Sequence, residues 1–534
     1  MAFSIDNLFD KIIDQTISRL QVNSLELGRR EFRPDEIIDF MDYWVGEIEK
    51  VLQNTKGNEH ITNETLLSIK KHRGYTYREF YDLLNPTDEK DFSNPAFLFH
   101  NISNFRDHKF HTLDLEYTPE AFKQISASFP KIGQVFFSKE IKNYIPLKDL
   151  ESHCYITART GHGKTELMRL MITNLIERSK NGEFSVVLLD PHKDFASKLS
   201  RSKMFIDNER VVYINPTLRE GYTPVFNPLE MEITNHTELA NYLNNIVSAI
   251  KSTIERYDDK LTINMVVTLR RCCAILAKRK NVTIHDLIRL LDFREDDPAS
   301  KELIEFAIAE DPRTFAKQKT NNKTNTNDAI TVRLSNLIED PHCYNLLTGA
   351  NSFDLEKHLN DGSVVIFDLK DLHELSLDAV GRFIISQIKS IILKRKEGEN
   401  KPVFLFIDEF PYFIGDDIEF MLTKLRAYGL HLVLANQYLN QLKDRAEVVR
   451  TQTNVKILGA TDYEMASYFA NNMRVKPDDI IDLPTLEFVV KSGNKRPVKI
   501  KIPTSLFYSK TNSHYMSDAE YEVFVNNQLS VLAP

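Results

Sequence analysis

The segment Cys154–Met168, CYITARTGHGKTELM, constrains the fold more than any other part of the chain. An apolar run ends in a loop with two glycines, and a helix-like stretch follows the loop. A buried strand that leads through such a loop into a helix is a building unit of α/β domains, in which strands and helices alternate. The rest of the chain is therefore expected to supply more strands and helices of this kind.

The glycine loop itself predicts a phosphate-binding site. Backbone N–H groups of a tight loop and of the following helix N-terminus form a concave site for anions. Lys164 would reach the β- and γ-phosphates of ATP, and the Thr165 hydroxyl would ligate Mg²⁺. Ala158 replaces the usual first glycine, where a small residue is sufficient; a chance strand–turn–helix is the alternative. The expected nucleotide-binding residues are Ala158, Arg159, Thr160, Gly161, His162, Gly163, Lys164, Thr165 and Glu166.

Seven short apolar segments predict the strands of a sheet. Near-continuous apolar runs suit strands that are buried on both faces of a parallel sheet. Helical periodicity between the runs indicates right-handed crossovers, so the expected fold class is α/β with a mainly parallel sheet. The predicted strands are residues 154–158, 184–189, 211–214, 364–367, 403–407, 431–434 and 455–458.

Acidic residues follow two of these predicted strands. In VFLFIDEF, Asp408 would hold the water shell of Mg²⁺, and Glu409 would act as the catalytic residue that polarises the attacking water. A solvated acidic turn is the alternative for this pair. In VVLLDPHKD, Asp190 is a further candidate for the metal, whereas His192 is expected to be structural.

The strand HLVLANQ ends at Gln437, which could lie beside the nucleotide and sense its γ-phosphate. An amide that caps a loop is the alternative for this residue. Just before this strand, LRAYGL contains Arg426, which could stabilise charge at the nucleotide of a neighbouring subunit. On spacing alone, a surface arginine is the favoured interpretation of Arg426.

The pattern of apolar residues divides the chain into several regions. Residues 1–135 have helical periodicity and are expected to form a mostly helical N-terminal domain for docking or assembly. Residues 136–234 and 346–510 alternate strands and helices and form the predicted ATPase core. Residues 235–345 lack strands and predict an inserted all-helical subdomain, and residues 511–534 remain as a C-terminal tail.

Three local patterns refine this division. Asn235 and Glu238 are placed as a capping pair at the start of the insertion. The polar stretch 317–328, KQKTNNKTNTND, has the composition of a mobile loop. The basic run Lys394-Arg395-Lys396 ends an apolar helix, where cations favour the helix dipole, and is expected to be a solvated helix end.

Composition limits the class of protein and its compartment. Among 534 residues the four cysteines show no CxxC spacing, which argues against a zinc site or a disulfide framework and favours a reducing compartment. No stretch approaches eighteen consecutive apolar residues, so a cytoplasmic protein without direct membrane insertion is expected. The net charge of −8 argues against a broadly basic nucleic-acid-binding surface, but it permits a local basic channel.

Together, the motifs resemble those of the HerA/FtsK superfamily of P-loop ATPases, and especially its HerA-like and conjugative coupling-protein branch. The resemblance covers about residues 140–500 and rests on TGHGKTELM, LLDPHKD, VVYINPTLREGYTPVFNPLE, AITVRLSNLIED, DGSVVIFDLKDL and FLFIDEFPYFIG, followed by LTKLRAYGLHLVLANQ and TQTNVKILGATD. It implies a RecA-like core, a hexameric ring with nucleotide between subunits, and DNA in the central channel. By motif position, Arg426 matches the family's trans-acting arginine and Gln437 its sensor glutamine.

The resemblance implies a ring-forming ATPase that translocates along double-stranded DNA. A second hypothesis is a HerA-like scaffold of an antiviral complex, in which residues 1–135 would hold an effector such as a nuclease or an NAD-consuming enzyme. A third is a soluble motor of a conjugation or secretion system, recruited to a membrane by other subunits. The lack of an apolar anchor departs from membrane-bound coupling proteins, and the helical N-terminal region departs from the β-barrel of archaeal HerA proteins.

Overall fold

A computed structural model describes residues 24–30 and 141–532, except 180, 192–193, 207, 231, 256–259, 295, 321–324, 399, 414 and 504–511. The chain divides into two compact units. The first contains Met1–Ile145 with Lys499–Lys501, and the second contains Pro146–Val498 with Ile502–Pro534. His192 and the helices expected in residues 1–135 lie outside the described residues, apart from one strand that is given below.

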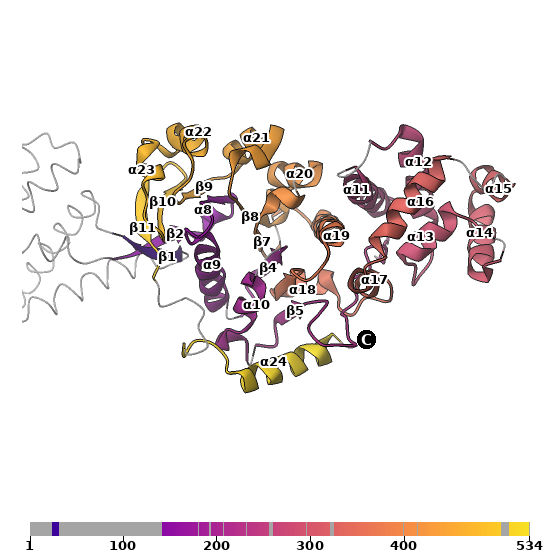
Figure 1. Cartoon of the computed structure of the whole chain (residues 1–534), viewed down its shortest axis with the longest axis horizontal. Helices are drawn as coiled ribbons and strands as arrows, with labels where there is room; N and C mark the ends of the chain where they lie inside the picture. The colour runs from indigo at the N-terminus through magenta and orange to yellow at the C-terminus, as the bar shows by residue number, and fades with distance from the viewer. Residues whose placement is uncertain are drawn as a thin grey trace, which may run out of the picture. The chain divides into compact units, whose positions relative to one another are not determined.

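The second unit is built on a mixed, mainly parallel sheet (Figure 1). Its strands follow the order β10-β9-β3-β8-β7-β4-β6-β5. The strands are β3 (Cys154–Thr157), β4 (Ser185–Asp190), β5 (Val211–Ile214), β6 (Val364–Asp368), β7 (Val403–Ile407), β8 (Leu430–Asn436), β9 (Val455–Leu458) and β10 (Glu487–Ser492).

All seven predicted strands are confirmed, and their pairing is parallel. Every residue of β3 to β9 is buried, which explains the near-continuous apolar runs. β10 was not predicted, and it pairs antiparallel with β9 so that Val490 lies opposite Ile457. The α/β fold with a mainly parallel sheet is therefore confirmed.

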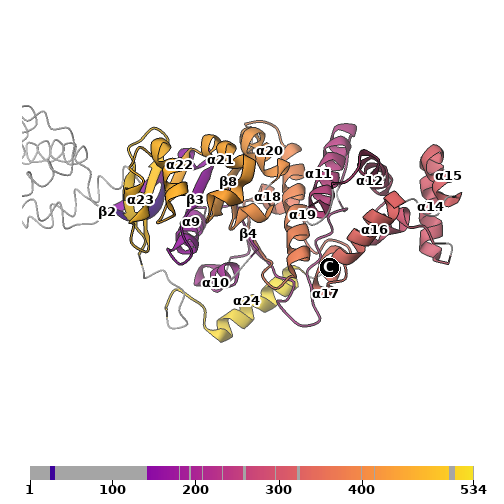
Figure 2. The same cartoon turned by 45° about the horizontal axis from the view of Figure 1, so that its top comes forward.

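Helices connect the strands of this sheet. The longest of them are α9, which follows β3, and α19, which follows β6 (Figure 2). The connecting helices are α8 (Leu147–Leu150), α9 (Lys164–Arg178), α10 (Phe195–Ser200), α18 (Leu355–Asp361), α19 (Glu374–Leu393), α20 (Asp416–Lys424), α21 (Ala446–Gln452), α22 (Tyr463–Met473) and α23 (Asp478–Ile481), with 3₁₀ turns η2 (Lys203–Phe205), η3 (Phe410–Phe413), η4 (Leu425–Tyr428) and η5 (Leu439–Arg445).

Between β5 and β6 the described chain is helical, and its first helix packs along α19 (Figure 1). The Asn235 side chain accepts a hydrogen bond from the Glu238 N–H at 2.9 Å, so the predicted cap is confirmed. The helices are α11 (His236–Ile254), α12 (Ile263–Leu276), α13 (Ile284–Leu291), α14 (Pro298–Glu310), α15 (Pro312–Thr320), α16 (Asn325–Leu337) and α17 (Pro341–Leu347).

Two predictions about polar segments are wrong in part. The stretch 317–328, expected to be a mobile loop, is helical up to Thr320 and again from Asn325, because buried apolar residues such as Phe315 and Ile330 anchor both helices in the core. The basic run after α19 is solvated only in part, because Lys396 is exposed whereas Lys394 is paired with Glu356. The Arg395 guanidinium is buried and donates to the Leu359 carbonyl at 2.8 Å, so this charge serves the fold.

The last helix, α24 (Asp518–Val531), packs on β5, the outermost strand at that end of the sheet (Figure 1). The buried Gln528 side chain donates to the Val211 carbonyl at 3.1 Å and accepts from the Tyr213 N–H at 2.8 Å. The side-chain amide thus pairs with the strand edge as a neighbouring strand would. The segment expected to be a tail therefore contains a helix that covers the edge of the sheet.

The described part of the first unit consists of strands. β1 (Ser24–Arg30) pairs antiparallel with β11 (Val498–Lys501), and it neighbours β2 (Ile141–Pro146). The Arg30 side chain donates to the Asn143 amide oxygen at 2.9 Å, which joins β1 to β2. Residues 24–30 of the region expected to be mostly helical are therefore a strand.

Candidate nucleotide site

The glycine loop joins the end of β3 to the start of α9. Gly161 (φ 81°) and Gly163 (φ 96°) both have left-handed backbone conformations, which glycine adopts without a steric penalty. Gly163 is the N-cap of α9, so the first turn of this helix directs its free N–H groups toward the loop. The loop therefore has the backbone conformation that an anion-binding loop requires, at the position where the motif predicts one.

Neighbouring backbone holds this loop in place. The Arg159 N–H donates to the Ala460 carbonyl at 2.7 Å, and the Leu486 N–H donates to the His162 carbonyl at 3.1 Å. Arg159 and Thr160 are exposed, whereas Ala158 is buried. The loop is thus supported from the segments after β9 and before β10, which leaves its outer side free to face a ligand.

The small residue at position 158 has a structural reason. A Cβ atom added to Gly459 would lie 2.8 Å from the Ala158 Cβ, closer than real Cβ atoms approach one another. Gly459 therefore supplies the room that the Ala158 methyl group occupies. Ala158, in place of the usual glycine, is thus accommodated because Gly459 follows β9 directly. The sequence of the loop alone does not reveal this contact.

The two acids follow β7 at the same edge of the sheet. Asp408 and Glu409 are buried, and the Asp408 carboxylate accepts a hydrogen bond from the Glu409 N–H at 3.0 Å. The Glu409 backbone has φ 51°, an uncommon conformation for a residue with a side chain, and such conformations cluster at functional sites. The turn after β7 thus fixes the directions of both carboxylates.

Lys164, Glu409 and Gln437 meet in one cluster with Thr160. The Lys164 ammonium lies 3.1 Å from Asp408 Oδ1 and forms an ion pair with Glu409. The Gln437 side chain donates to Glu409 and accepts from the Thr160 hydroxyl at 2.5 Å. Elements that are far apart in sequence, namely the loop, the end of β7 and the end of β8, therefore converge.

The remaining loop residues show how well the site suits Mg²⁺. Thr165, in the first turn of α9, is half-buried, and Glu166 forms an ion pair with the buried Arg169. Within the described part of the chain, no group of three or more His, Cys, Asp or Glu side chains could hold a metal. A hydroxyl, one carboxylate and nucleotide phosphates are the oxygen ligands that Mg²⁺ takes in phosphoryl-transfer sites, so the residues present fit this ion.

Two predicted residues make other contacts. Asp190 ends β4, and its buried carboxylate accepts from the Ala196 N–H at 2.8 Å, so one of its oxygens holds the start of α10. Arg426, in η4, lines a pocket with Ser152 and His153, the residues just before β3. It therefore lies near the amino end of β3, whereas the loop follows its carboxyl end.

Sequence reasoning missed a buried amide that supports the site. Asn436, the last residue of β8, accepts from the Tyr155 hydroxyl at 2.6 Å and donates to the Tyr438 carbonyl at 3.0 Å. These bonds fix the backbone on both sides of Gln437. The available signal was that two polar residues, Asn436 and Gln437, end the apolar strand. Only Gln437 was predicted to have a role.

The strand, glycine loop and helix, with acids after a neighbouring parallel strand, define a P-loop NTPase with a RecA-like core. The family model described as the central domain of helicase HerA matches residues 130–388. This match, over slightly less than half of the chain, supports a HerA/FtsK-type P-loop ATPase. The matched residues include the glycine loop and Asp190, and they end within α19, before Asp408.

Solved structures of the plasmid coupling protein TrwB share the fold. One, in complex with ADP and Mg²⁺, has a TM-score of 0.53 at 18% identity and covers 70% of this chain and 90% of its own. Another, the unbound monoclinic form of the bacterial conjugative coupling protein TrwBdeltaN70, has a TM-score of 0.51 at 17% identity and covers 67% and 87%. No curated protein matches the chain. Among the described residues, no helix is both long and apolar enough to cross a bilayer.

Proposed function

We propose that this protein is an ATP hydrolase that assembles into a ring, a hexamer by family resemblance, and couples hydrolysis to translocation along double-stranded DNA. The observation that carries the ATPase part is the joined cluster of Thr160, Lys164, Glu409 and Gln437. It connects the phosphate loop to a buried carboxylate through an amide. The similarity of residues 130–388 to the central domain of helicase HerA supports the motor part.

In this proposal, the loop N–H groups and Lys164 bind the phosphates of ATP. Thr165 and Asp408 hold Mg²⁺, which neutralises charge on the phosphates when it is bound. Glu409 accepts the proton of the attacking water, and Gln437 orients Glu409 and relates its position to that of the loop. Arg426 contributes positive charge to the nucleotide of an adjacent subunit, since it lies away from its own loop.

The test is the rate of ATP hydrolysis with and without linear duplex DNA. We expect DNA to raise the rate of the wild type, and Lys164→Ala or Glu409→Gln to lower it by about 100-fold or more, because each removes a group that acts on the reacting phosphate. Exposed Lys476→Ala and Glu220→Gln are matched controls that should retain activity. An active enzyme that no duplex DNA stimulates would contradict the translocase.

A soluble motor of a conjugation or secretion system is a second candidate. The fold shared with the coupling protein TrwB favours it. Such a motor would co-fractionate with membranes only when its partner subunits are present. Fractionation of cells with and without these partners therefore distinguishes it from a free translocase.

An assembly scaffold of an antiviral complex is the third candidate. The first unit favours it, because residues 1–129 precede the stretch that matches the HerA family and belong to a compact unit of their own. A nuclease or an NAD-consuming enzyme held there would be gated by the nucleotide state of the ring.

A further inference from the structure

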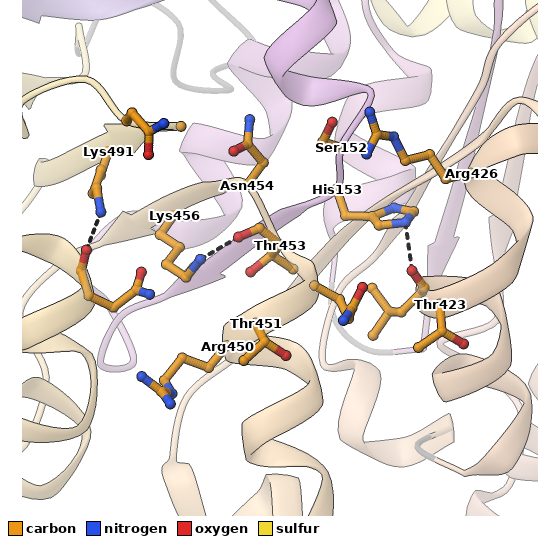
Figure 3. A pocket seen from close by; sticks show the side chains of 15 residues that line it. Ser152, His153, Thr423, Arg426, Arg450, Thr451, Thr453, Asn454, Lys456 and Lys491 are labelled. Carbon is orange, nitrogen blue, oxygen red and sulfur yellow. Dashed lines mark hydrogen bonds between the residues drawn. The ribbon is translucent and has the colours of Figure 1, made fainter.

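A polar cavity of about 470 Å³ lies at the opposite edge of the sheet from the glycine loop. We call it the cation pocket, because Arg426, Arg450, Lys456 and Lys491 line it (Figure 3). Among the described residues that line it, none is Asp or Glu. Of these four residues only Arg426 is a candidate from the sequence, because Lys456 and Lys491 lie within strands β9 and β10.

The two lysines lie on adjacent strands with like charges facing each other. Lys456 of β9 and Lys491 of β10 are directly opposite in the antiparallel register. Like charges in this arrangement destabilise a strand pair, and a buried ammonium costs further free energy unless an anion accompanies it. Lys456 is 5% exposed, and neither lysine has an ion-pair partner within the described part of the chain, whereas Arg450 is paired with Glu447 at 2.8 Å. The arrangement is therefore unfavourable for the isolated pocket and favourable when an anion enters it.

Helix capping explains only part of this arrangement. Lys456 donates to the Thr453 carbonyl after α21, and Lys491 donates to the Asn472 carbonyl near the end of α22. Each ammonium has three N–H donors, so the carbonyl uses one and the others can serve a ligand. Burial, together with the charges of Lys491 and Arg450, lowers the pKa of Lys456 to about 8, while the Cys154 thiol opposes this shift. A bound anion would return that pKa toward its ordinary value.

The pocket is too far from the chain's own glycine loop to serve it. It is lined by Ser152 and His153 before β3 and by Asn454 before β9, whereas the loop begins after Thr157. The four residues of β3 separate the two ends by roughly 13 Å at about 3.3 Å per residue. A nucleotide in the loop of the same chain therefore lies beyond the reach of these lysines.

We propose that the cation pocket receives the phosphate groups of a nucleotide bound by a second copy of the chain, and that Lys456 and Lys491 contact them together with Arg426. This inference rests on the proposed ring-forming ATPase. The cations converge on one compact cavity instead of following a stripe, which suits a polyphosphate better than a nucleic-acid backbone. A contact between the loop of one copy and the pocket of the next is head-to-tail, the type of interface that closes rings.

The test uses the full chain with Lys456→Met and Lys491→Gln, each of which removes a charge while retaining much of the side chain. Both should lower kcat for ATP hydrolysis by about 100-fold, as expected for loss of a group that stabilises transition-state charge. The affinity for a fluorescent ADP analogue should change little, because the chain's own loop is intact. Thermal stability should hold or rise, whereas a merely structural lysine would lower it.

Mixing variants then shows which copy supplies the lysine. Glu409→Gln inactivates the nucleotide site of its own subunit, and Lys456→Met inactivates only the site of a neighbour. Random rings of equal parts should recover about a quarter of the wild-type rate, because a quarter of the interfaces join an intact site to an intact pocket. Lys476→Ala, an exposed lysine outside the pocket, is the control for loss of a charge.

Each other outcome overturns the inference. Mixtures that stay inactive would place Lys456 in its own subunit's site or in the fold alone. Full activity of Lys456→Met, beside an active wild type and an inactive Glu409→Gln, would remove this pocket and leave the proposed function intact. Weaker duplex-DNA binding with an unchanged DNA-free rate would assign the pocket to nucleic acid. A wild type that does not hydrolyse ATP would remove both proposals.

Discussion

His153 joins three elements through a single buried ring. Its Nδ1 accepts from the Leu432 N–H at 2.9 Å, and its Nε2 donates to the Leu422 carbonyl at 3.1 Å. The accepting role of Nδ1 fixes the neutral tautomer with the proton on Nε2. The residue before β3 is thereby held to α20 and to the start of β8, on either side of Arg426.

Protonation of this ring is expected to destabilise the protein in acid. Burial lowers the pKa of His153 from 6.5 to about 4, and burial with the nearby His153 lowers that of His431 to about 3. The unfolded chain therefore binds protons that the folded chain excludes, and stability falls as pH falls from 6.5 toward 4. For His153 alone, the loss approaches about 3 kcal/mol. Urea denaturation between pH 7 and pH 4 measures this loss.

The matched variant is His153→Asn, since asparagine tolerates the left-handed backbone (φ 64°) at this position. It should be less stable than the wild type at pH 7 but lose less stability on acidification. His236→Asn, at an exposed histidine, should retain the wild-type pH dependence. An unchanged pH dependence in His153→Asn would show that this ring is not the group responsible.

At the scale of elements, α24 stabilises the edge of the sheet through one amide. Gln528→Ala leaves the Tyr213 N–H and the Val211 carbonyl without their partner, and each buried unsatisfied group costs about 1–3 kcal/mol. We expect a lower free energy of unfolding and faster hydrogen exchange at the Tyr213 amide. Asn527→Ala, on the exposed face of the same helix, should have neither effect. Unchanged exchange at Tyr213 in Gln528→Ala would contradict this role.

The strands were predictable from sequence because burial on both faces imposes continuous apolar runs, as in β7 and β8. β10 was not predicted, because Glu487 and Lys491 interrupt its apolar pattern. It is a strand because it pairs with β9, and this pairing is not visible in the sequence. The helices α15 and α16 were missed for a similar reason. Most of their residues are polar, but a few buried apolar residues such as Phe315 and Ile330 attach these segments to the core as helices.

The candidate site was predictable where function requires a residue type at a fixed place after a strand. Lys164, Glu409 and Gln437 therefore came from sequence, and the structure brings them together. The opposed Lys456 and Lys491 could not be found this way, because their proximity arises from the antiparallel register. Residue roles that depend on which strands are neighbours become visible only with the topology.

At the scale of the molecule, the division into two units predicts that the ATPase does not need residues 1–135. Strands β10 to β5, the glycine loop, both acids and the cation pocket all belong to the second unit. A chain without residues 1–135 should therefore hydrolyse ATP within about twofold of the full rate, since a domain with its own core folds independently.

The same deletion distinguishes the motor from the scaffold. If residues 1–135 hold an effector, the shortened chain should keep ATP hydrolysis and its stimulation by DNA, yet lose the effector in co-purification from its native host. The full chain with Lys164→Ala is the matched control, because it should lose hydrolysis and keep the effector. A shortened chain that is folded by circular dichroism but unable to hydrolyse ATP would show that the first unit is required for hydrolysis, and the independence of the two units would then be wrong.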